Sequence, residues 1–354
     1  MTTSRLISFE QAYASLADFD CVIDVRSPAE FAEDHIPGAI NCPVLNNEER
    51  VRVGTLYKQV SPFEAKKVGA ALVAKNIGNH IEQNFLDKPK DWKPLIYCWR
   101  GGNRSGSMTH IMAKIGWHAM QLDGGYKGFR RFVNQQLPSL AAAANWIVLC
   151  GETGTGKSRL LQCLESQGAQ VIDLEQLAQH RGSVLGKLPE NGQPSQKYFE
   201  TEIWRKLSRF DFNKPIFVEA ESKKVGNLRV PDAMMEKMRQ SKCIQLQLVM
   251  EERVALLRDD YQHFINDTAL LGTQLRCLID LHGKERIERW STLAESNQIT
   301  ELIQQLLLQH YDPAYQKAIA RNFELINEAK SYVVNDKSDP SYQMLAKQIL
   351  QEYY

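Results

Sequence analysis

Two kinds of pattern are missing from the 354-residue sequence, and each absence narrows the class of protein. The seven cysteines form no CxxC pair and no regular spacing, which argues against a structural zinc site and against a disulfide framework. No apolar run approaches the roughly 20 residues of a membrane-spanning helix, and residues 1–9 lack the apolar core of a signal peptide. We therefore expect a cytoplasmic protein with reduced cysteines and no membrane segment.

Excess charge of either sign is also missing. The chain has 43 Lys and Arg against 42 Asp and Glu, so its net charge is +1. Overall charge provides no attraction to nucleic acid, and any bound RNA must be held by a local basic patch. Hydrophobic residues make up 43% of the chain, which at this length is enough for two domains with separate cores.

Short apolar strands alternate with helical segments, and this pattern predicts an α/β fold with mostly parallel sheets. Ser27 is expected to cap a helix that begins at Pro28, and Gly124-Gly125 should end a strand. Beyond residue 251 the pattern is mainly helical, with Leu302, Leu306 and Gln309 on one face and Ile303 and Leu307 beside it. The predicted strands lie at 21–25, 94–98, 120–123, 146–150, 170–173, 215–219 and 244–249.

These patterns divide the chain into four parts. We expect a parallel-sheet domain with flanking helices at 1–137 and a linker or short connecting helix at 138–145. A second α/β domain should occupy 146–250, and a mainly helical region should occupy 251–354. In that last region Tyr311, Tyr315 and Phe323 are expected to be core residues.

The first candidate site is the loop Cys98-Trp99-Arg100-Gly101-Gly102-Asn103-Arg104-Ser105, between a predicted strand and a predicted helix. At a helix N-terminus the dipole and the backbone N–H groups lower the pKa of a thiol and hold an anion. Arginines add forked donors, and paired glycines let the backbone curl. We predict Cys98 as the nucleophile with Arg100 and Arg104 as partners. The remaining anion-loop residues are Gly101, Gly102, Asn103 and Ser105.

The second candidate site is a complete GxxxxGK[ST] phosphate-binding loop between a strand and a helix, the context that this motif needs. Its backbone N–H groups would wrap phosphate oxygens. Lys157 would reach the terminal phosphates, and Ser158 would bind Mg²⁺ if a metal is used. The motif indicates a bound phosphate or diphosphate and does not identify a nucleotide. The predicted phosphate-binding residues are Gly151, Thr153, Gly154, Thr155, Gly156, Lys157 and Ser158.

Acidic residues end two of the strands near this loop. Glu219 and Asp173 occupy strand ends, where the acidic partner of a P-loop is found, and Glu221 follows two residues after the first. An alternative is that these carboxylates only cap the strand ends or pair with nearby lysines. A Glu at the strand end weakens the case for ordinary ATP hydrolysis.

Basic clusters follow the candidate loops, and some are interleaved with aromatic residues. Basic side chains neutralise phosphates, and aromatic rings stack on splayed bases. Each cluster by itself is typical of a solvent-exposed surface. Together, the clusters favour a groove that binds nucleic acid. The candidate RNA contacts are Lys127, Arg130, Arg131, Arg181, Lys223 and Lys224, with Lys187, Lys197 and Arg229 close by in sequence.

Residues 22–31, VIDVRSPAEF, and 35–41, HIPGAIN, resemble the opening motif of the rhodanese domain, and the Cys98 loop resembles its catalytic loop. Arg104 lies six residues after Cys98, whereas the common sulfurtransferase loop has five. The longer spacing is that of Cys-dependent phosphatases. With the P-loop and the segments 193–200 and 217–222, nearly the whole chain resembles the tRNA 2-selenouridine synthase family.

That resemblance implies a rhodanese domain joined to a P-loop domain and a helical C-terminal part. It implies an enzyme that converts 2-thiouridine at the tRNA wobble position (U34) to 2-selenouridine with selenophosphate. It also implies S-geranylation from geranyl diphosphate and a selenosulfide on Cys98. No resident cofactor is expected beyond an undecided Mg²⁺. Two alternatives stay open: a Cys-dependent phosphatase fused to a kinase-like P-loop domain, and a non-catalytic RNA-binding adaptor.

Overall fold

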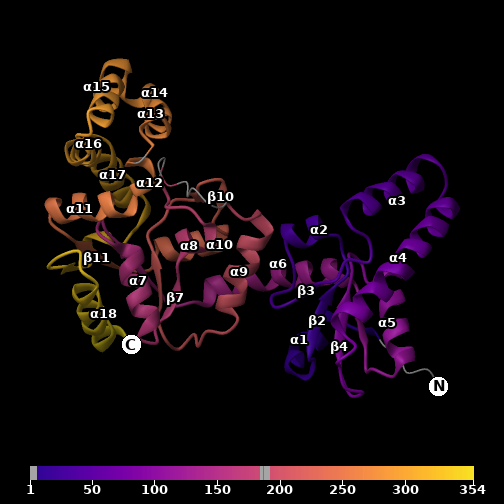
Figure 1. Ribbon diagram of the computed structural model, residues 1–354. Coiled ribbons are helices and arrows are strands. Elements are labelled where there is room, and N and C mark those ends of the chain that lie inside the picture. Colours follow the sequence, from indigo (N-terminus) through magenta and orange to yellow (C-terminus); the bar gives the residue numbers. More distant parts are fainter. Residues whose placement is uncertain (1–5, 184–185, 187–191, 266) are drawn as a thin grey trace. The chain divides into compact units, whose positions relative to one another are not determined.

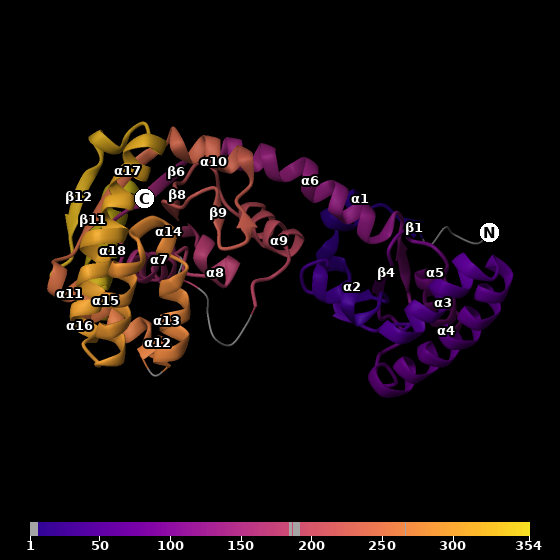
Figure 2. The same ribbon diagram turned by 90° about the horizontal axis from the view of Figure 1, so that it is seen from above.

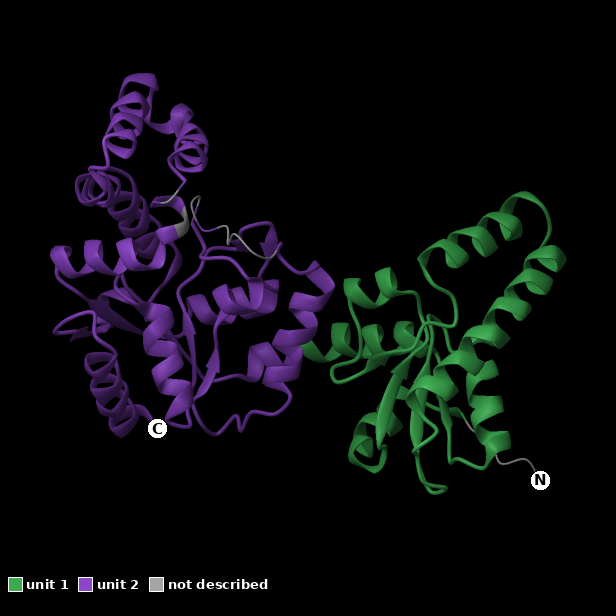
Figure 3. Cartoon of the chain, in the orientation of Figure 1, with its two compact units in different colours: residues 1–137 green, residues 138–354 purple. Residues whose placement is uncertain are grey.

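The computed structural model describes residues 6–183, 186, 192–265 and 267–354 (Figure 1). Lys187, one of the basic residues noted above, lies outside the described residues. The chain divides into two compact units, residues 1–137 and 138–354 (Figure 3). Both units have the α/β architecture that the alternation of strands and helices predicts.

Unit 1 is built on one five-stranded sheet in which every pair of neighbouring strands is parallel. The strand order β1-β5-β4-β2-β3 places β4 in the middle, and all four β4 residues are buried. Because both sides of β4 are paired, the position of its carboxyl end is fixed. The strands are β1 (Leu6–Ile7), β2 (Cys21–Asp24), β3 (Ile40–Asn41), β4 (Pro94–Tyr97) and β5 (Met120–Leu122).

Helices flank this sheet, and their ends carry the expected caps. The Ser27 side chain accepts a hydrogen bond from the Glu30 N–H, with Pro28 in the first turn, as the sequence predicts. Helices α3 and α4 form a helical hairpin (Figure 1). The helices are α1 (Phe9–Ala14), η1 (Leu16–Asp18), α2 (Pro28–Glu33), α3 (Asn47–Gln59), α4 (Pro62–Asn84), α5 (Asn103–Ile115) and α6 (Gly125–Ala143).

Helix α6 extends beyond residue 137, where the two compact units divide. The segment 138–145, which the sequence identifies as a linker or short connecting helix, is mostly the last part of this helix. Pro138 lies inside it. Trp146, the first residue of the next strand, donates a hydrogen bond from Nε1 to the carbonyl oxygen of Ala141 at 3.0 Å, which holds the last turn of the helix against the start of that strand.

Unit 2 contains a second five-stranded parallel sheet, in the order β12-β11-β6-β8-β7. Strand β12 comes from the region predicted to be helical, and it pairs with β11 at the sheet edge. Only Tyr332 of its four residues is buried, so no apolar run signals it. The strands are β6 (Trp146–Cys150), β7 (Gln170–Ile172), β8 (Ile216–Glu219), β11 (Lys242–Gln247) and β12 (Lys330–Val333), with a separate antiparallel pair β9 (Lys224–Val225) and β10 (Leu228–Arg229).

The helices of unit 2 pack into two cores. Helices α7 and α18 lie side by side (Figure 2) and bury Leu160, Leu164, Leu345 and Ile349 against the sheet. A second core lies among α12, α13, α15 and α16, around the fully buried Trp290. The bounds are α7 (Lys157–Ser166), α8 (Leu174–Ala178), α9 (Gln196–Leu207), α10 (Asp232–Arg239), α11 (Met250–Asp260), α12 (Gln262–Ile265), α13 (Thr268–Arg276), α14 (Ile279–His282), α15 (Lys284–Glu295), α16 (Ile299–Leu306), η2 (Leu307–Tyr311), α17 (Asp312–Asn322), η3 (Ile326–Glu328) and α18 (Asp339–Tyr353).

The apolar face predicted for residues 302–309 is only partly correct. Leu302, Leu306 and Leu307 are buried, but Gln309 is exposed. The cause is a π-helical turn, η2, which winds the backbone more widely than an α-helix and takes Gln309 off the expected face.

None of the described helices combines the length and the apolar composition that crossing a membrane requires.

Candidate functional site

Each candidate loop follows the middle strand of its sheet. The Cys98 loop leaves the carboxyl end of β4 and leads into α5, and the P-loop leaves the carboxyl end of β6 and leads into α7. In open parallel sheets, ligands bind at the carboxyl ends of strands, where the chain turns into helix N-termini. Both loops therefore occupy the position in their unit that favours an anion.

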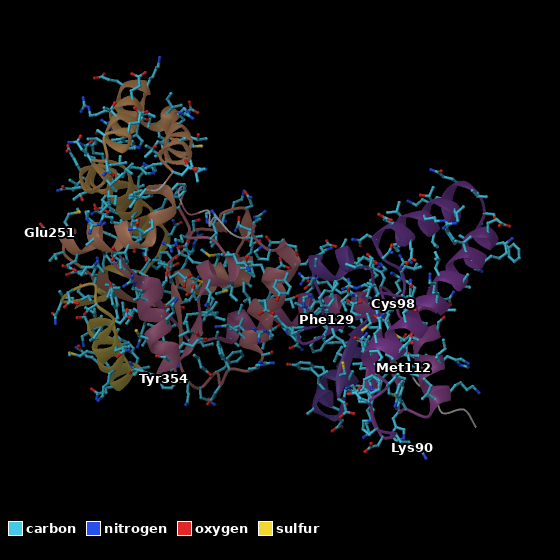
Figure 4. The ribbon with its side chains drawn as sticks, in the orientation of Figure 1. Lys90, Cys98, Met112, Phe129, Glu251 and Tyr354 are labelled. Atoms are coloured by element: carbon cyan, nitrogen blue, oxygen red, sulfur yellow. The ribbon has the colours of Figure 1, made fainter. Side chains whose placement is uncertain are left out.

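Cys98 lies at the end of β4 opposite to Lys90 (Figure 4). Its side chain is 3% exposed, and the Ser105 hydroxyl donates a hydrogen bond to its Sγ at 3.1 Å. Burial alone would raise the pKa of the Cys98 thiol. The Ser105 hydroxyl, the backbone N–H groups of Ser105 and Arg100, and the charge of Arg104 outweigh burial and bring this pKa below its ordinary value. The loop thus favours the thiolate.

The two arginines of this loop lie in different surroundings. Arg104 is largely buried, and its Nη1 donates to Glu30 Oε2 in α2 at 2.9 Å. Its guanidinium therefore holds α2 against the loop and acts on Cys98 through its charge. Arg100 is exposed, and its backbone N–H faces the thiol. A phosphatase would need an arginine fork free for phosphate, and the fork of Arg104 is already paired with a carboxylate.

A second turn, Gly124-Gly125, lies directly under the Cys98 loop. Gly125 has a φ of +52°, and a Cβ there would collide with the carbonyl oxygen of Cys98. The N–H groups of Tyr126 and Lys127 donate to the carbonyls of Cys98 and Trp99 at 2.8 and 3.1 Å. The turn that ends strand β5 therefore also supports the loop from below, because only glycine lets the two backbones approach this closely.

Aromatic and charged side chains form a buried layer behind the loop. The Trp99 ring stacks on the Tyr126 ring with centroids 5.2 Å apart. The guanidinium of Arg26 lies 4.1 Å from the centroid of the Tyr126 ring and pairs with Asp24; Arg26 and Asp24 are both fully buried. Tyr126 donates to Asp34 Oδ2 at 2.8 Å. This layer fixes the half-buried Trp99 next to the thiol.

The P-loop residues are held in place by their own loop and by distant helices. Lys157 Nζ donates to the carbonyl of Gly151 at 2.7 Å, folded over the loop where a phosphate would be cradled. The Gly151 N–H donates to the Tyr315 hydroxyl at 2.6 Å, and the Tyr342 hydroxyl donates to the Thr155 carbonyl at 3.0 Å. Tyr315, expected to be core, instead touches the P-loop.

Arg253 is a buried arginine that no sequence motif singled out. It donates to the Thr153 carbonyl at 2.9 Å and to Glu152 Oε2 at 2.8 Å. Its Nη2 and Nη1 also donate to Asp312, at the start of α17, at 2.6 and 3.1 Å. One side chain therefore ties the P-loop to two helices that lie about 100 residues or more further along the chain.

Four carboxyl groups gather beside the P-loop. Glu219 is fully buried, and burial, with Asp173, Glu175 and Glu221 nearby, holds its pKa well above the ordinary value. Burial raises the pKa of Asp173 to about 6, and that of Glu221 to about 8 with help from the charge of Glu175. Crowding thus keeps part of this cluster protonated and neutral at pH 7.

Ser158 and the carboxyl groups of this cluster are hydrogen-bonded to one another and to the backbone of α8. The Ser158 hydroxyl, which the sequence assigns to a metal, donates to Glu175 Oε2 at 2.9 Å. Glu219 Oε1 accepts the Glu175 N–H, and Asp173 caps α8. Within the described ranges, no three His, Cys, Asp or Glu residues are arranged to hold a metal ion. Glu175 was not among the sequence candidates, and its contact with Ser158 depends on the fold.

A cavity of about 940 Å³ lies over the P-loop and joins these groups. It is lined by Lys157, Ser158, Arg181, Glu175 and Glu221, and on the far side by helix α17. Residues more than 150 positions apart in the sequence thus line one cavity. This cavity is large enough for a diphosphate and an attached group.

The candidate RNA contacts divide into paired and exposed residues. Arg130 Nη1 lies 4.0 Å from the buried Asp34, and Arg181 donates to the Asp260 carbonyl at 2.8 Å. The other candidates, and Arg229, are exposed on their units and remain suited to phosphate contacts; they are Lys127, Arg131, Lys223 and Lys224.

Replacing Ser105 by Ala should raise the pKa of Cys98, because a hydrogen bond to the thiolate is lost. A bond to a charged group contributes about 1.5 kcal/mol or more, so alkylation of Cys98 by iodoacetamide at pH 7 should slow about 10-fold. The pH at which the rate is half-maximal should move upward. Ser107→Ala, on the same helix, is the matched control, and the exposed Cys277 is removed from all proteins. Equal alkylation rates for both serine variants would contradict the role of the Ser105 hydroxyl in lowering the pKa of Cys98.

Glu221→Gln should change how pyrophosphate affinity depends on pH. With a pKa raised to about 8, Glu221 is neutral at pH 7 and becomes negative as the pH rises through 8. The new charge repels a diphosphate, so affinity measured by calorimetry should fall several-fold between pH 7 and 9. The Gln variant cannot ionise and should keep more of its affinity. Glu236→Gln, exposed on α10, should follow the wild type; identical slopes for all three would refute the role of Glu221.

Comparison with known proteins matches both units. Residues 8–132 match the model of the rhodanese-like domain, and residues 144–274 match that of the tRNA 2-selenouridine synthase AAA domain. Three relatives have the name tRNA 2-selenouridine synthase. The one from Alcanivorax borkumensis is 33% identical, covering 85% of this chain and 90% of that protein. The one from Shewanella denitrificans is 34% identical, covering 83% and 87%. The one from Nitrosomonas europaea is 35% identical, covering 68% and 63%. The chain thus belongs to the tRNA 2-selenouridine synthase family.

Proposed function

We propose that this protein is a tRNA-modifying enzyme that converts wobble 2-thiouridine to 2-selenouridine. The observation that carries the proposal is the presence, in one chain of this family, of a polarised thiol in one anion loop and a P-loop in another. A plain RNA-binding adaptor needs phosphate contacts but no acidified thiol, so the state of Cys98 favours catalysis over that alternative.

We assign the P-loop to geranyl transfer. The sulfur of 2-thiouridine attacks C1 of geranyl diphosphate, the C–S bond forms, and the C1–O bond breaks with its electron pair leaving on diphosphate. The base loses its N3 proton to solvent. Lys157 and the loop N–H groups would offset the charge that builds on that leaving group. The protonated carboxyl groups beside the loop add little repulsion at pH 7. Geranylation makes the sulfur a better leaving group for the next step.

We assign selenium transfer to the Cys98 loop. Its N–H groups and the nearby charge of Arg104 favour an anionic selenium donor, for which selenophosphate is the proposed source. In the transfer itself, the selenium of selenophosphate attacks C2, and the C2–S bond breaks with its electron pair leaving on the geranyl thiolate. Water then cleaves the Se–P bond and phosphate is released. The exposed basic residues, with Arg100 beside the thiol, are the proposed contacts for tRNA phosphates.

The phosphatase alternative has one supporting feature, the six-residue spacing from Cys98 to Arg104. The pairing of Arg104 with Glu30 weighs against it, because a phosphate would have to displace a carboxylate held at 2.9 Å. Release of phosphate from a generic aryl phosphate by the purified protein, lost in Cys98→Ser, would favour the phosphatase.

The assignment of geranyl transfer to the P-loop and selenium transfer to the Cys98 loop is tested with variants expressed in a strain that lacks this protein. Cys98→Ala should abolish 2-selenouridine in tRNA and leave S-geranyl-2-thiouridine present or increased, as measured by mass spectrometry of nucleosides. Lys157→Ala should reduce the geranylated nucleoside about 10-fold or more, since a charged contact to the diphosphate is lost.

Cys277→Ala and Lys347→Ala are the matched controls, because both residues are exposed and distant in sequence from the loops. Both should behave as the wild type. If Cys98→Ala and Lys157→Ala remove the same single nucleoside, the assignment of one loop to each step is wrong. If tRNA from the deletion strain still contains 2-selenouridine, the proposed function itself fails.

A further inference from the structure

A second, apolar cavity in unit 2 opens beside the P-loop cavity. Its wall is formed by α11, α12, α13 and α16, through Leu257, Phe264, Leu271, Leu302, Ile303 and Leu306. Thr153 of the P-loop, Ser183 and Tyr261 line both this cavity and the larger one, and so does Tyr311 of the π-helical turn. The two spaces therefore meet at the phosphate loop itself.

Leu257 shows how close the apolar wall lies to the phosphate loop. A Cβ built on Gly154 would approach Leu257 Cγ and Cδ1 to 2.9 Å, so this leucine packs directly against the loop backbone. Gly154 has a φ of +82°, and its missing side chain makes room for the contact. A ligand whose phosphates lie on the loop thus has a hydrocarbon surface within reach of its next atoms.

The chemistry of the lining selects between ligand classes. Beyond the shared rim, the lining side chains are Leu, Ile and Phe, which offer no hydrogen-bond donor or acceptor. The hydroxyl groups and base edge of a nucleoside would lose their water partners there without replacement. A hydrocarbon chain would instead gain free energy in proportion to the apolar area that it buries.

We propose that this cavity receives the far end of the hydrocarbon chain of a prenyl diphosphate whose diphosphate lies on the P-loop, and that Ile303 limits the chain length. The inference rests on the proposed function and deepens it. The apolar cavity encloses about 60 Å³, less than the roughly 150 Å³ that accommodates benzene. It therefore takes the chain end, while the carbons near the diphosphate stay in the larger cavity, open to the attacking sulfur.

Binding of ligands that share a diphosphate and differ in the attached group tests the cavity. By calorimetry, the wild-type protein should bind geranyl diphosphate about 10-fold or more tightly than dimethylallyl diphosphate, because only the longer chain places its end in the apolar cavity. Inorganic pyrophosphate should bind more weakly than geranyl diphosphate, and so should ADP. Tighter binding of ADP than of geranyl diphosphate would overturn the inference.

Substitutions at Ile303 should move this preference in opposite directions. Ile303 is partly exposed on α16, so a larger side chain there fills the cavity without entering the core. Ile303→Phe should reduce the preference for geranyl over dimethylallyl diphosphate to about 2-fold or less, and Ile303→Ala should improve binding of the fifteen-carbon farnesyl diphosphate several-fold. Gln304→Phe, the adjacent exposed position, is the matched control and should retain the wild-type preference.

Pyrophosphate affinity separates failure of this inference from failure of the proposed function. It should stay within about 2-fold of the wild-type value in all three variants, because the loop contacts are unchanged, and it should fall in Lys157→Ala. Unchanged chain-length preference in both Ile303 variants overturns the cavity assignment and leaves the P-loop assignment standing. Unchanged pyrophosphate affinity in Lys157→Ala overturns the P-loop assignment.

Discussion

Both candidate loops depend on one constraint: each must connect a buried strand, paired on both sides, to the N-terminus of a helix. In unit 1 this strand is β4, and in unit 2 it is β6, each the third of five parallel strands. Because neighbours on both sides fix the strand, backbone N–H groups of the following loop stay directed at one point without help from a ligand. The rest of each unit supports that geometry.

The support comes from buried charged and polar contacts that span large distances in sequence. Arg104 holds α2 to the Cys98 loop through Glu30, and Arg253 connects the P-loop to Asp312. Removing Asp312 would leave the buried Arg253 with an uncompensated charge, which costs about 3–5 kcal/mol. These side chains therefore restrict the loops to one arrangement, and both arginines act on the candidate sites through backbone and charge.

The surroundings of the two loops explain why similar anion-binding geometry suits different chemistry. Around Cys98, hydrogen-bond donors favour a thiolate against the effect of burial. Around Lys157, crowded carboxyl groups are held partly protonated, and an apolar wall begins at Gly154. The first environment stabilises a nucleophilic anion. The second combines a diphosphate cradle with a hydrocarbon surface, an arrangement that suits an amphiphilic ligand more than a nucleotide.

The sequence alone determined the α/β class, the strand-to-helix position of both candidate loops and the cap at Ser27, because each depends on residues that are neighbours in the chain. It missed β12, whose single buried residue leaves no apolar run. It also placed Gln309 on the same helical face as Leu302 and Leu306, because a π-helical turn has no local signature. Only the tertiary structure decided that Arg253, Tyr315 and Glu175 touch the P-loop and that Arg104 pairs with Glu30. Those contacts join residues 17 to 164 positions apart, and such pairings are fixed by packing of whole elements, which local patterns do not encode.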